Sequence, residues 1–130
     1  MNNKFLDYYK TESQELNKYI NEFNEKLVQE ENPFIRENLE VFKNLNADGK
    51  LVRGTLVNLG YKIAKEDSNY SYPLATAFEI FQTSILVHDD IIDHDDLRRG
   101  KQTIHSYNGK KYYELTHSNL SYDLPPCSLE

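Results

Sequence analysis

The chain has 130 residues and a formal net charge of −6, from 15 Lys and Arg against 21 Asp and Glu. This length suits one folded domain or part of one, and the acidic balance argues against nucleic acid or an anionic membrane surface as the main partner. Cys127 is the only cysteine, which excludes an internal disulfide and favours the cytoplasm, and neither the polar first 14 residues nor any apolar run predicts a signal peptide or a membrane span.

The first half of the chain predicts two helices, because apolar residues recur there every three or four positions. The first helix is expected over residues 5–28 and ends before Pro33. The second is expected over residues 34–45, where a run of turn-forming residues follows it, with Gly49 as a candidate C-cap.

Two further helices are predicted ahead of a cluster of acidic residues. One covers residues 56–63 and follows a short basic segment. The other begins near Pro73, which suits a first helical turn, and continues through residues 75–87 into the cluster. No segment shows the alternation that is typical of a strand, so the predicted fold class is all-α.

The acidic cluster predicts a metal site. Asp89 and Asp93 would lie one turn apart on one face of the helix, with Asp90 beside them, so the three carboxylates are expected to converge. Hard divalent cations such as Mg²⁺ bind to carboxylates and to the phosphate oxygens of a substrate. The sequence therefore predicts that these aspartates hold Mg²⁺.

Two arginines follow the aspartates, at the point where the helix is expected to end near Gly100. Arg98 and Arg99 carry guanidinium groups, which bind phosphate oxygens through forked pairs of hydrogen bonds. Carboxylates, metal, phosphate and arginines form a charge-balanced set. The segment is therefore interpreted as a site for a phosphorylated substrate and its metal.

These residues resemble a known family, the trans-isoprenyl diphosphate synthases or polyprenyl synthetases, whose first aspartate-rich motif reads D-D-x-x-D-x-x-x-x-R-R-G-x-P-T. The chain departs from it at Gln102, where the family has proline. Residues 49–54, GKLVRG, are similar to the family's G-K-x-x-R-P, with Gly54 in place of proline and Leu51 in place of a common arginine. Gln82, seven residues before the aspartates, stands where the family usually has His or Gln.

The resemblance implies the N-terminal helices of an isoprenoid synthase-type helical bundle, in truncated form. It extends from about residue 46 to about residue 113, so we expect residues 1–113 to form the N-terminal part of a polyprenyl synthetase domain. Residues 114–130 carry two consecutive prolines and no apolar period, and are expected to form a divergent, loose tail. The family's second aspartate-rich motif is absent from these 130 residues.

The function implied by the resemblance is Mg²⁺-dependent chain elongation, in which an allylic diphosphate is condensed with isopentenyl diphosphate. The product would be of geranylgeranyl or farnesyl type, and the protein a homodimer. The residues implied as catalytic are Asp89, Asp90, Asp93 and Arg98, with the three aspartates as metal ligands. The residues implied as substrate-binding are Lys50, Arg53, Gln82, Arg98 and Arg99, of which Arg98 would contact the allylic diphosphate and the others isopentenyl diphosphate. Because only half of the metal site is present, the chain alone is expected to be inactive or nearly so.

Three alternatives remain at this stage. Two His-Asp pairs, at 88–89 and 94–95, with His105 and His117, are similar to the metal phosphohydrolases built around an HD dipeptide, but that interpretation leaves the arginines unexplained. A calcium loop would require glycine where Arg98 stands. The main alternative is a non-catalytic, truncated or regulatory chain that binds diphosphate and pairs with a full-length subunit, which the missing second motif favours.

Overall fold

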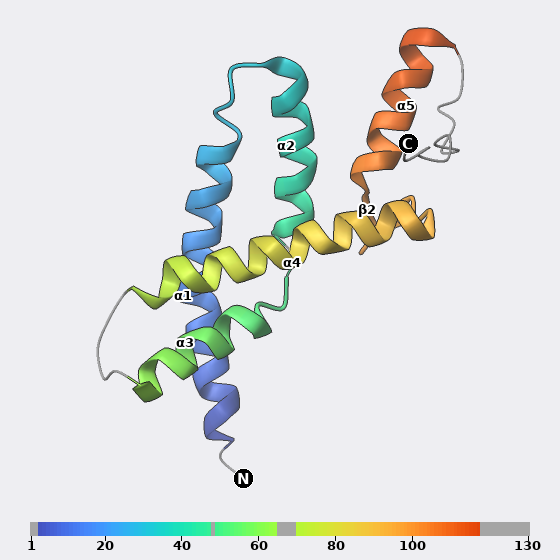
Figure 1. Cartoon of the computed structure of the whole chain (residues 1–130). Coiled ribbons are helices and arrows are strands. Elements are labelled where there is room, and N and C mark those ends of the chain that lie inside the picture. The colour runs from blue at the N-terminus through green and yellow to red at the C-terminus, as the bar shows by residue number, and fades with distance from the viewer. Residues whose placement is uncertain (1–2, 48, 65–69, 118–130) are drawn as a thin grey trace, which may run out of the picture.

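The computed structural model describes residues 3–47, 49–64 and 70–117, which form five helices and one short hairpin (Figure 1). In chain order these elements are α1 (Lys4–Leu27), α2 (Pro33–Asn46), α3 (Val52–Ala64), α4 (Ser71–Asp93), β1 (Leu97–Arg98), β2 (Lys101–Gln102) and α5 (Ile104–Thr116). The predicted all-α class is confirmed. None of the described helices combines the length and the apolar character needed to cross a membrane.

The predicted boundaries of α2 are confirmed at its start and wrong at its cap. The Asn32 side chain accepts a hydrogen bond at 3.0 Å from the backbone N–H two residues later, and Pro33 occupies the first helical turn. At the other end, Ala47 has a right-handed φ of −67° and its N–H still bonds to the Lys43 carbonyl. The helix therefore ends without a left-handed glycine, and the expected C-cap at Gly49 is not formed.

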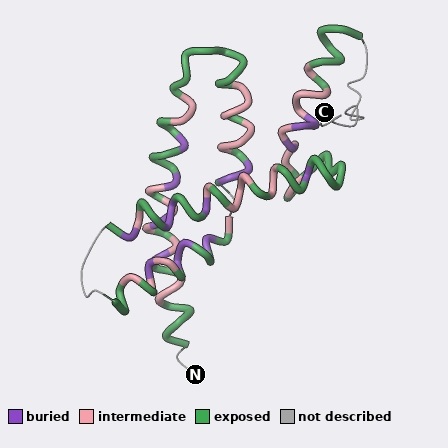
Figure 2. The backbone as a smooth tube through the Cα atoms, in the orientation of Figure 1, coloured by how far each residue is buried: buried purple, intermediate pink, exposed green. Residues whose placement is uncertain are grey.

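α4 is the central helix, because it contacts α1, α2, α3 and α5 (Figure 1). The buried apolar cluster lies where α1, the start of α3 and α4 meet, and Figure 2 also shows buried residues at the start of α5. The buried apolar side chains among the described residues are Leu16, Ile20, Leu45, Leu51 and Ala75. Leu16 and Ile20 lie one turn apart on α1, so the apolar spacing predicted for this helix places them in the core.

α3 and α4 approach each other closely at Gly54. A Cβ atom at this position would lie 2.4 Å from Leu16 Cδ2 and 3.0 Å from the Ala75 carbonyl oxygen. Both distances are shorter than ordinary van der Waals contact. A side chain of any kind at position 54 would therefore push α1 or α4 away from α3.

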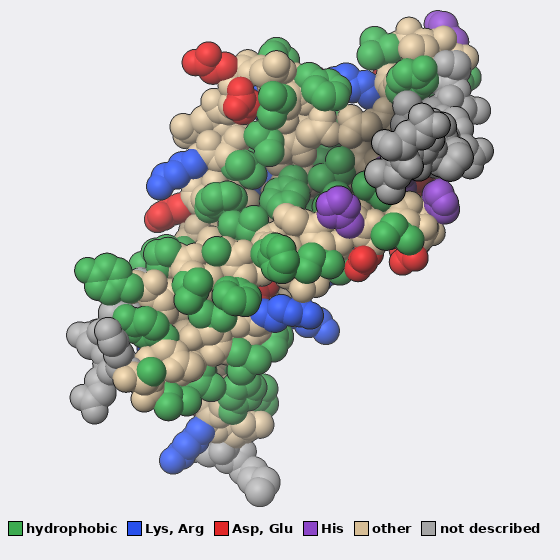
Figure 3. Space-filling model, in the orientation of Figure 1, with side chains coloured by type: hydrophobic (Ala, Val, Ile, Leu, Met, Phe, Trp, Pro, Cys, Tyr) green, Lys and Arg blue, Asp and Glu red, His purple; other side chains and the backbone are tan. Residues whose placement is uncertain are grey.

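One side of α4 is apolar and exposed. Leu74, Phe78, Phe81 and Ile85 follow one another at steps of four, three and four residues, so they lie on one face of the helix, and they are between 39% and 64% exposed. We call these four residues the α4 stripe. Figure 3 shows apolar side chains spread over the face of the molecule that α4 crosses.

The arginine pair lies in a hairpin and not at a helix end, so the prediction of no strand is wrong here. α4 ends at Asp93, followed by His94 with a left-handed φ of 57°. β1 and β2 then pair antiparallel, and the turn between them consists of Arg99 (φ 52°) and Gly100 (φ 77°). Two left-handed residues in a two-residue loop are typical of the type I′ turn. Strands of two residues are too short to show an alternating pattern in sequence.

α5 packs beside α2 through polar contacts. The Tyr107 hydroxyl donates to Glu37 Oε2 at 3.0 Å, and Asn108 Nδ2 donates to Asn38 Oδ1 at 2.6 Å. The helix continues to Thr116, three residues past the boundary expected at residue 113. Most of the expected tail, residues 118–130, lies outside the described residues.

Candidate functional site

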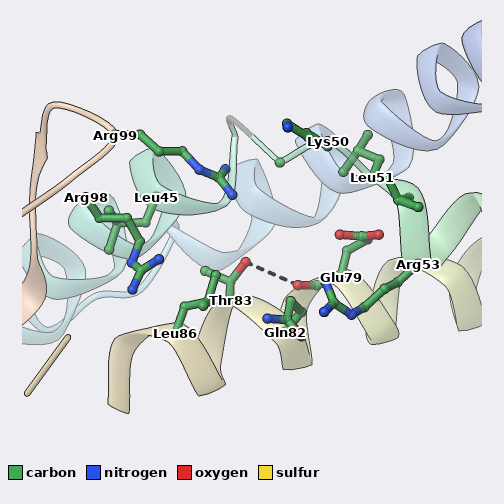
Figure 4. Close-up of a pocket in the computed structure, with 12 residues that line it drawn as sticks. Leu45, Lys50, Leu51, Arg53, Glu79, Gln82, Thr83, Leu86, Arg98 and Arg99 are labelled. Atoms are coloured by element: carbon green, nitrogen blue, oxygen red, sulfur yellow. Dashed lines mark hydrogen bonds between the residues drawn. The ribbon is translucent and has the colours of Figure 1, made fainter. Parts of the chain in front are cut away.

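A pocket of about 190 Å³ lies where α4, the start of α3 and the hairpin meet (Figure 4). α4 contributes one face to it, because residues 79, 82, 83 and 86 follow the helical period. The described residues that line it are Leu45, Gly49, Lys50, Leu51, Val52, Arg53, Glu79, Gln82, Thr83, Leu86, Arg98 and Arg99. The fold thus brings together, in one pocket, the five residues that the sequence motifs predict to bind substrate.

The segment before α3 turns sharply at Leu51. This buried leucine has a left-handed φ of 53°, a conformation that costs about 1–2 kcal/mol for a residue with a Cβ atom. Its carbonyl accepts two hydrogen bonds from Thr55, from the N–H at 3.0 Å and from Oγ1 at 2.7 Å. The turn is therefore fixed, and it places Lys50 and Arg53 in the lining of one pocket.

Lys50 and Arg53 form no ion pair with any residue that the structure describes. The Lys50 backbone is nevertheless anchored, because the Tyr9 hydroxyl on α1 donates a hydrogen bond to its carbonyl oxygen. Both side chains are exposed. Their charges are therefore available to an anion that enters the pocket.

Among the lining residues that the structure describes, Glu79 is the only acidic one. Its buried Oε1 accepts a hydrogen bond at 2.7 Å from the backbone N–H of Gly54, in the first turn of α3. The first N–H groups of a helix have no partner within the helix, so this carboxylate satisfies one of them. Glu79 thereby ties the start of α3 to α4.

Replacing Glu79 with alanine is expected to lower the free energy of unfolding by about 1–3 kcal/mol, because the buried Gly54 N–H would lose its acceptor. Urea denaturation followed by circular dichroism measures this loss. Glu79→Gln is the matched control, since it keeps an oxygen at the same position and should lose clearly less. Equal losses in the two variants would show that the hydrogen bond to Gly54 does not matter.

Arg98 forms a forked ion pair with Asp90. Its Nε lies 2.7 Å from Asp90 Oδ1 and 3.0 Å from Oδ2, and its Nη2 lies 2.5 Å from Oδ1. The Asp90 side chain is only 1% exposed, whereas that of Arg98 is 25% exposed and reaches the pocket. The hydrogen bond that Arg98 donates to Asp90, above all, raises the pKa of Arg98 above its usual value. The guanidinium is therefore held in place at the edge of the pocket.

The expectation that three carboxylates converge is wrong. Asp90 is buried against Arg98, whereas Asp89 and Asp93 are exposed. In the described part of the chain, no group of three or more His, Cys, Asp or Glu side chains could hold a metal ion. The physical reason is that a buried carboxylate must be paired, and Arg98 pairs with Asp90. Asp89 and Asp93 still fit Mg²⁺, which is usually held by one or two carboxylates together with substrate phosphates.

The sequence motifs did not identify four of the residues that line the pocket. Leu45, Glu79, Thr83 and Leu86 belong to no motif that was singled out. The helical period through Gln82 was the available signal for three of them, because steps of three and four residues from a binding residue reach the same face. Leu45 comes from the end of α2, and only the packing of α2 on α4 brings it to the pocket.

Three of the four histidines lie at helix ends or in the packed interior. His94 and His117 follow α4 and α5 with left-handed backbones, at φ 57° and 54°. His105 is buried, with Nδ1 at 3.2 Å from Thr103 Oγ1, and His88 is exposed on α4. Helix ends and packing therefore account for the positions of three of the four. This arrangement lends no support to the phosphohydrolase interpretation.

Comparison with known proteins identifies relatives over the same region. The profile of the polyprenyl synthetase family matches residues 36–116. The chain is 42% identical over 66 residues to the short chain isoprenyl diphosphate synthase of Methanocaldococcus jannaschii, a match that covers 51% of this chain and 20% of that protein. It is 36% identical over 94 residues to the geranylgeranyl pyrophosphate synthase of Geoglobus acetivorans, covering 71% and 28%.

A third relative is the heptaprenyl diphosphate synthase component 2 of Geobacillus stearothermophilus, 42% identical over 60 residues, with coverage of 46% of this chain and 19% of that protein. The matched region thus spans between about a fifth and three tenths of the length of these curated relatives. No solved structure gives a significant match to the chain. The family profile covers more than half of the 130 residues, including residues 49–54, the acidic cluster and the arginine pair at 98–99. The chain therefore belongs to the polyprenyl synthetase family.

Proposed function

We propose that the chain supplies the diphosphate-binding part of a Mg²⁺-dependent prenyltransferase, which condenses an allylic diphosphate with isopentenyl diphosphate. One observation carries this proposal. The pocket gathers four cationic side chains and Gln82 from three separate segments of the chain, as Figure 4 illustrates. Charge-assisted hydrogen bonds from such a group suit a diphosphate, which presents several anionic oxygens at once.

Each part of the site has a proposed role. Lys50, Arg53, Gln82 and Arg99 bind isopentenyl diphosphate, and Arg98 contacts the allylic diphosphate. The allylic C–O bond breaks, the double bond of isopentenyl diphosphate attacks the resulting carbocation, and a proton leaves. The guanidinium of Arg98 stabilises the charge that develops on the departing allylic diphosphate. Asp89 and Asp93 hold Mg²⁺, which when bound supplies further positive charge at the leaving group.

Binding of inorganic pyrophosphate and of isopentenyl diphosphate tests the proposal. Lys50→Ala and Arg53→Ala are each expected to raise the Kd about tenfold or more, because a hydrogen bond to a charged group contributes about 1.5–3 kcal/mol. Isothermal titration calorimetry measures the change. Lys18→Ala is the control, since Lys18 lies on α1 and pairs with Glu15 at 2.6 Å.

The control variant should bind both diphosphates as the unaltered chain does. Equal weakening by Lys18→Ala would mean that the effect follows total charge and not the pocket. If the unaltered chain binds neither diphosphate, the proposed function fails.

A non-catalytic role as a diphosphate-binding or regulatory chain that pairs with a full-length subunit is the second candidate. One observation favours it: one relative is named as a component of a synthase. Incubation with Mg²⁺ and both diphosphates separates the two candidates. Product formation that Asp89→Ala abolishes supports catalysis, whereas binding without turnover supports the second candidate.

Finer features of the protein are also proposed. We propose a homodimer located in the cytoplasm, because the family resemblance implies the former and the single cysteine favours the latter. We propose that the family domain includes α5 to its end at Thr116, since the helix is continuous past residue 113. Analytical ultracentrifugation measures the oligomeric state directly.

A further inference from the structure

Asp90 differs from the other acidic residues of its motif in its burial. Asp89 and Asp93, and likewise Asp95 and Asp96, are exposed, whereas the Asp90 side chain is 1% exposed. A carboxylate in that position is stable as an anion only when a partner satisfies it. Arg98 is the partner, and its Nε and Nη2 engage both carboxylate oxygens at 2.5–3.0 Å.

The geometry of this pair divides the guanidinium into two sides. An arginine side chain carries five N–H donors in a fixed plane. Nε and Nη2 donate to Asp90, and Nη1 makes no hydrogen bond with any residue that the structure describes. Because Arg98 also lines the pocket, the side that Asp90 leaves open is the side available to a ligand there.

The backbone around the pair is fixed as well. The Asp90 carbonyl accepts hydrogen bonds from the N–H of His94 and, at 3.0 Å, from that of Asp95. Thr103, which follows β2, donates through Oγ1 to the Asp95 carbonyl at 2.9 Å. The segment between α4 and the hairpin is therefore held at both ends, so Arg98 approaches Asp90 from a defined direction.

We propose that Asp90 is a positioning residue, which presents the open side of Arg98 to a diphosphate in the pocket and does not bind the metal ion. The inference rests on the proposed function, because it assigns Arg98 to a diphosphate. It follows from the burial of Asp90, whose oxygens are already occupied. An arginine loses considerable rotamer freedom when it binds a ligand, and Asp90 removes that loss by ordering the side chain beforehand.

The first test is a thermodynamic cycle on inorganic pyrophosphate binding, measured by calorimetry in EDTA. Asp90→Ala is expected to raise the Kd several-fold, up to about tenfold, by releasing the Arg98 side chain. In an Arg98→Ala background the same substitution should weaken binding no further. Asp96→Ala is the control: this aspartate of the same acidic segment is exposed, its Oδ1 lies 3.9 Å from His105 Nε2, and its removal should leave the metal-free Kd unchanged.

Repeating the titrations with Mg²⁺ distinguishes positioning from metal binding. Asp89→Ala should lose the gain in affinity that Mg²⁺ provides, whereas Asp90→Ala should keep that gain. The proposal is overturned if Asp90→Ala binds metal-free pyrophosphate as well as the unaltered chain, or loses only the Mg²⁺-dependent gain. Asp90→Asn retains the side-chain volume and one acceptor oxygen, and it serves if the alanine variant does not fold.

A second readout needs no ligand. The Nε–H proton of Arg98, observed in a ¹⁵N NMR spectrum, should exchange slowly with solvent in the unaltered chain and in Asp89→Ala. In Asp90→Ala it should exchange rapidly. Rapid exchange in the unaltered chain would overturn the positioning role. Slow exchange without any pyrophosphate binding would instead overturn the proposed function, so the two failures are distinguishable.

Discussion

Leu16→Ala is expected to lower the free energy of unfolding by about 2–5 kcal/mol, the range for removing a large buried side chain. Leu16 is fully buried on α1, in the cluster that also contains Ile20, Leu51 and Ala75. With so small a cluster, few neighbouring side chains can move to fill the space. Urea denaturation followed by the helical circular dichroism signal measures the loss.

Leu6→Ala is the matched control for Leu16→Ala. Both leucines lie on α1, but Leu6 is 46% exposed. A substitution at such a position usually changes stability by no more than about 0.5 kcal/mol. If the two variants lose stability equally, the core is not organised around Leu16 as described.

Gly54→Ala is expected to destabilise the chain by about 1–3 kcal/mol, the usual cost of forcing additional atoms into a packed interior. The added Cβ would lie 2.4 Å from Leu16 Cδ2 and 3.0 Å from the Ala75 carbonyl oxygen. Gly60→Ala on the same helix is the control, because in the described part of the chain no atom outside its chain neighbours and its own helix backbone lies within 4 Å of its Cβ position. There alanine should stabilise α3 by about 0.5–1 kcal/mol through its higher helix propensity.

The Gly54 and Leu16 substitutions should also be coupled, because the nearest atom to the added Cβ belongs to Leu16. Once Leu16 is alanine, its Cδ2 is absent and the methyl group at position 54 partly fills the cavity. The loss caused by Gly54→Ala should therefore be smaller in the Leu16→Ala background, as measured by a double-mutant cycle. Additive losses would indicate that the contact with the Ala75 carbonyl dominates.

The helices could be predicted from sequence because their apolar residues are periodic and their ends carry recognisable residues. Asn32 and Pro33 begin α2 as a cap and a first-turn proline should. The hairpin could not be predicted in the same way. Its strands have two residues each, and Arg99-Gly100 is not among the dipeptides most typical of a type I′ turn.

The pocket was only partly predictable. Motif positions identified Lys50, Arg53, Gln82, Arg98 and Arg99, and all five line it. The burial of Asp90 was not predictable, because its neighbour Asp89 has the same chemistry and differs only in which side of α4 it occupies. The left-handed backbone of Leu51 was not predictable either, because tertiary packing imposes this conformation on a residue type that disfavours it.

The α4 stripe has a consequence for how the protein responds to temperature. Leu74, Phe78, Phe81 and Ile85 present apolar side chains to water along about three turns of the central helix. The attraction between apolar surfaces weakens on cooling, because hydration of such surfaces has a large heat capacity. Any self-association through this stripe should therefore be greater in a warm solution than in a chilled one, the reverse of an association governed by hydrogen bonds.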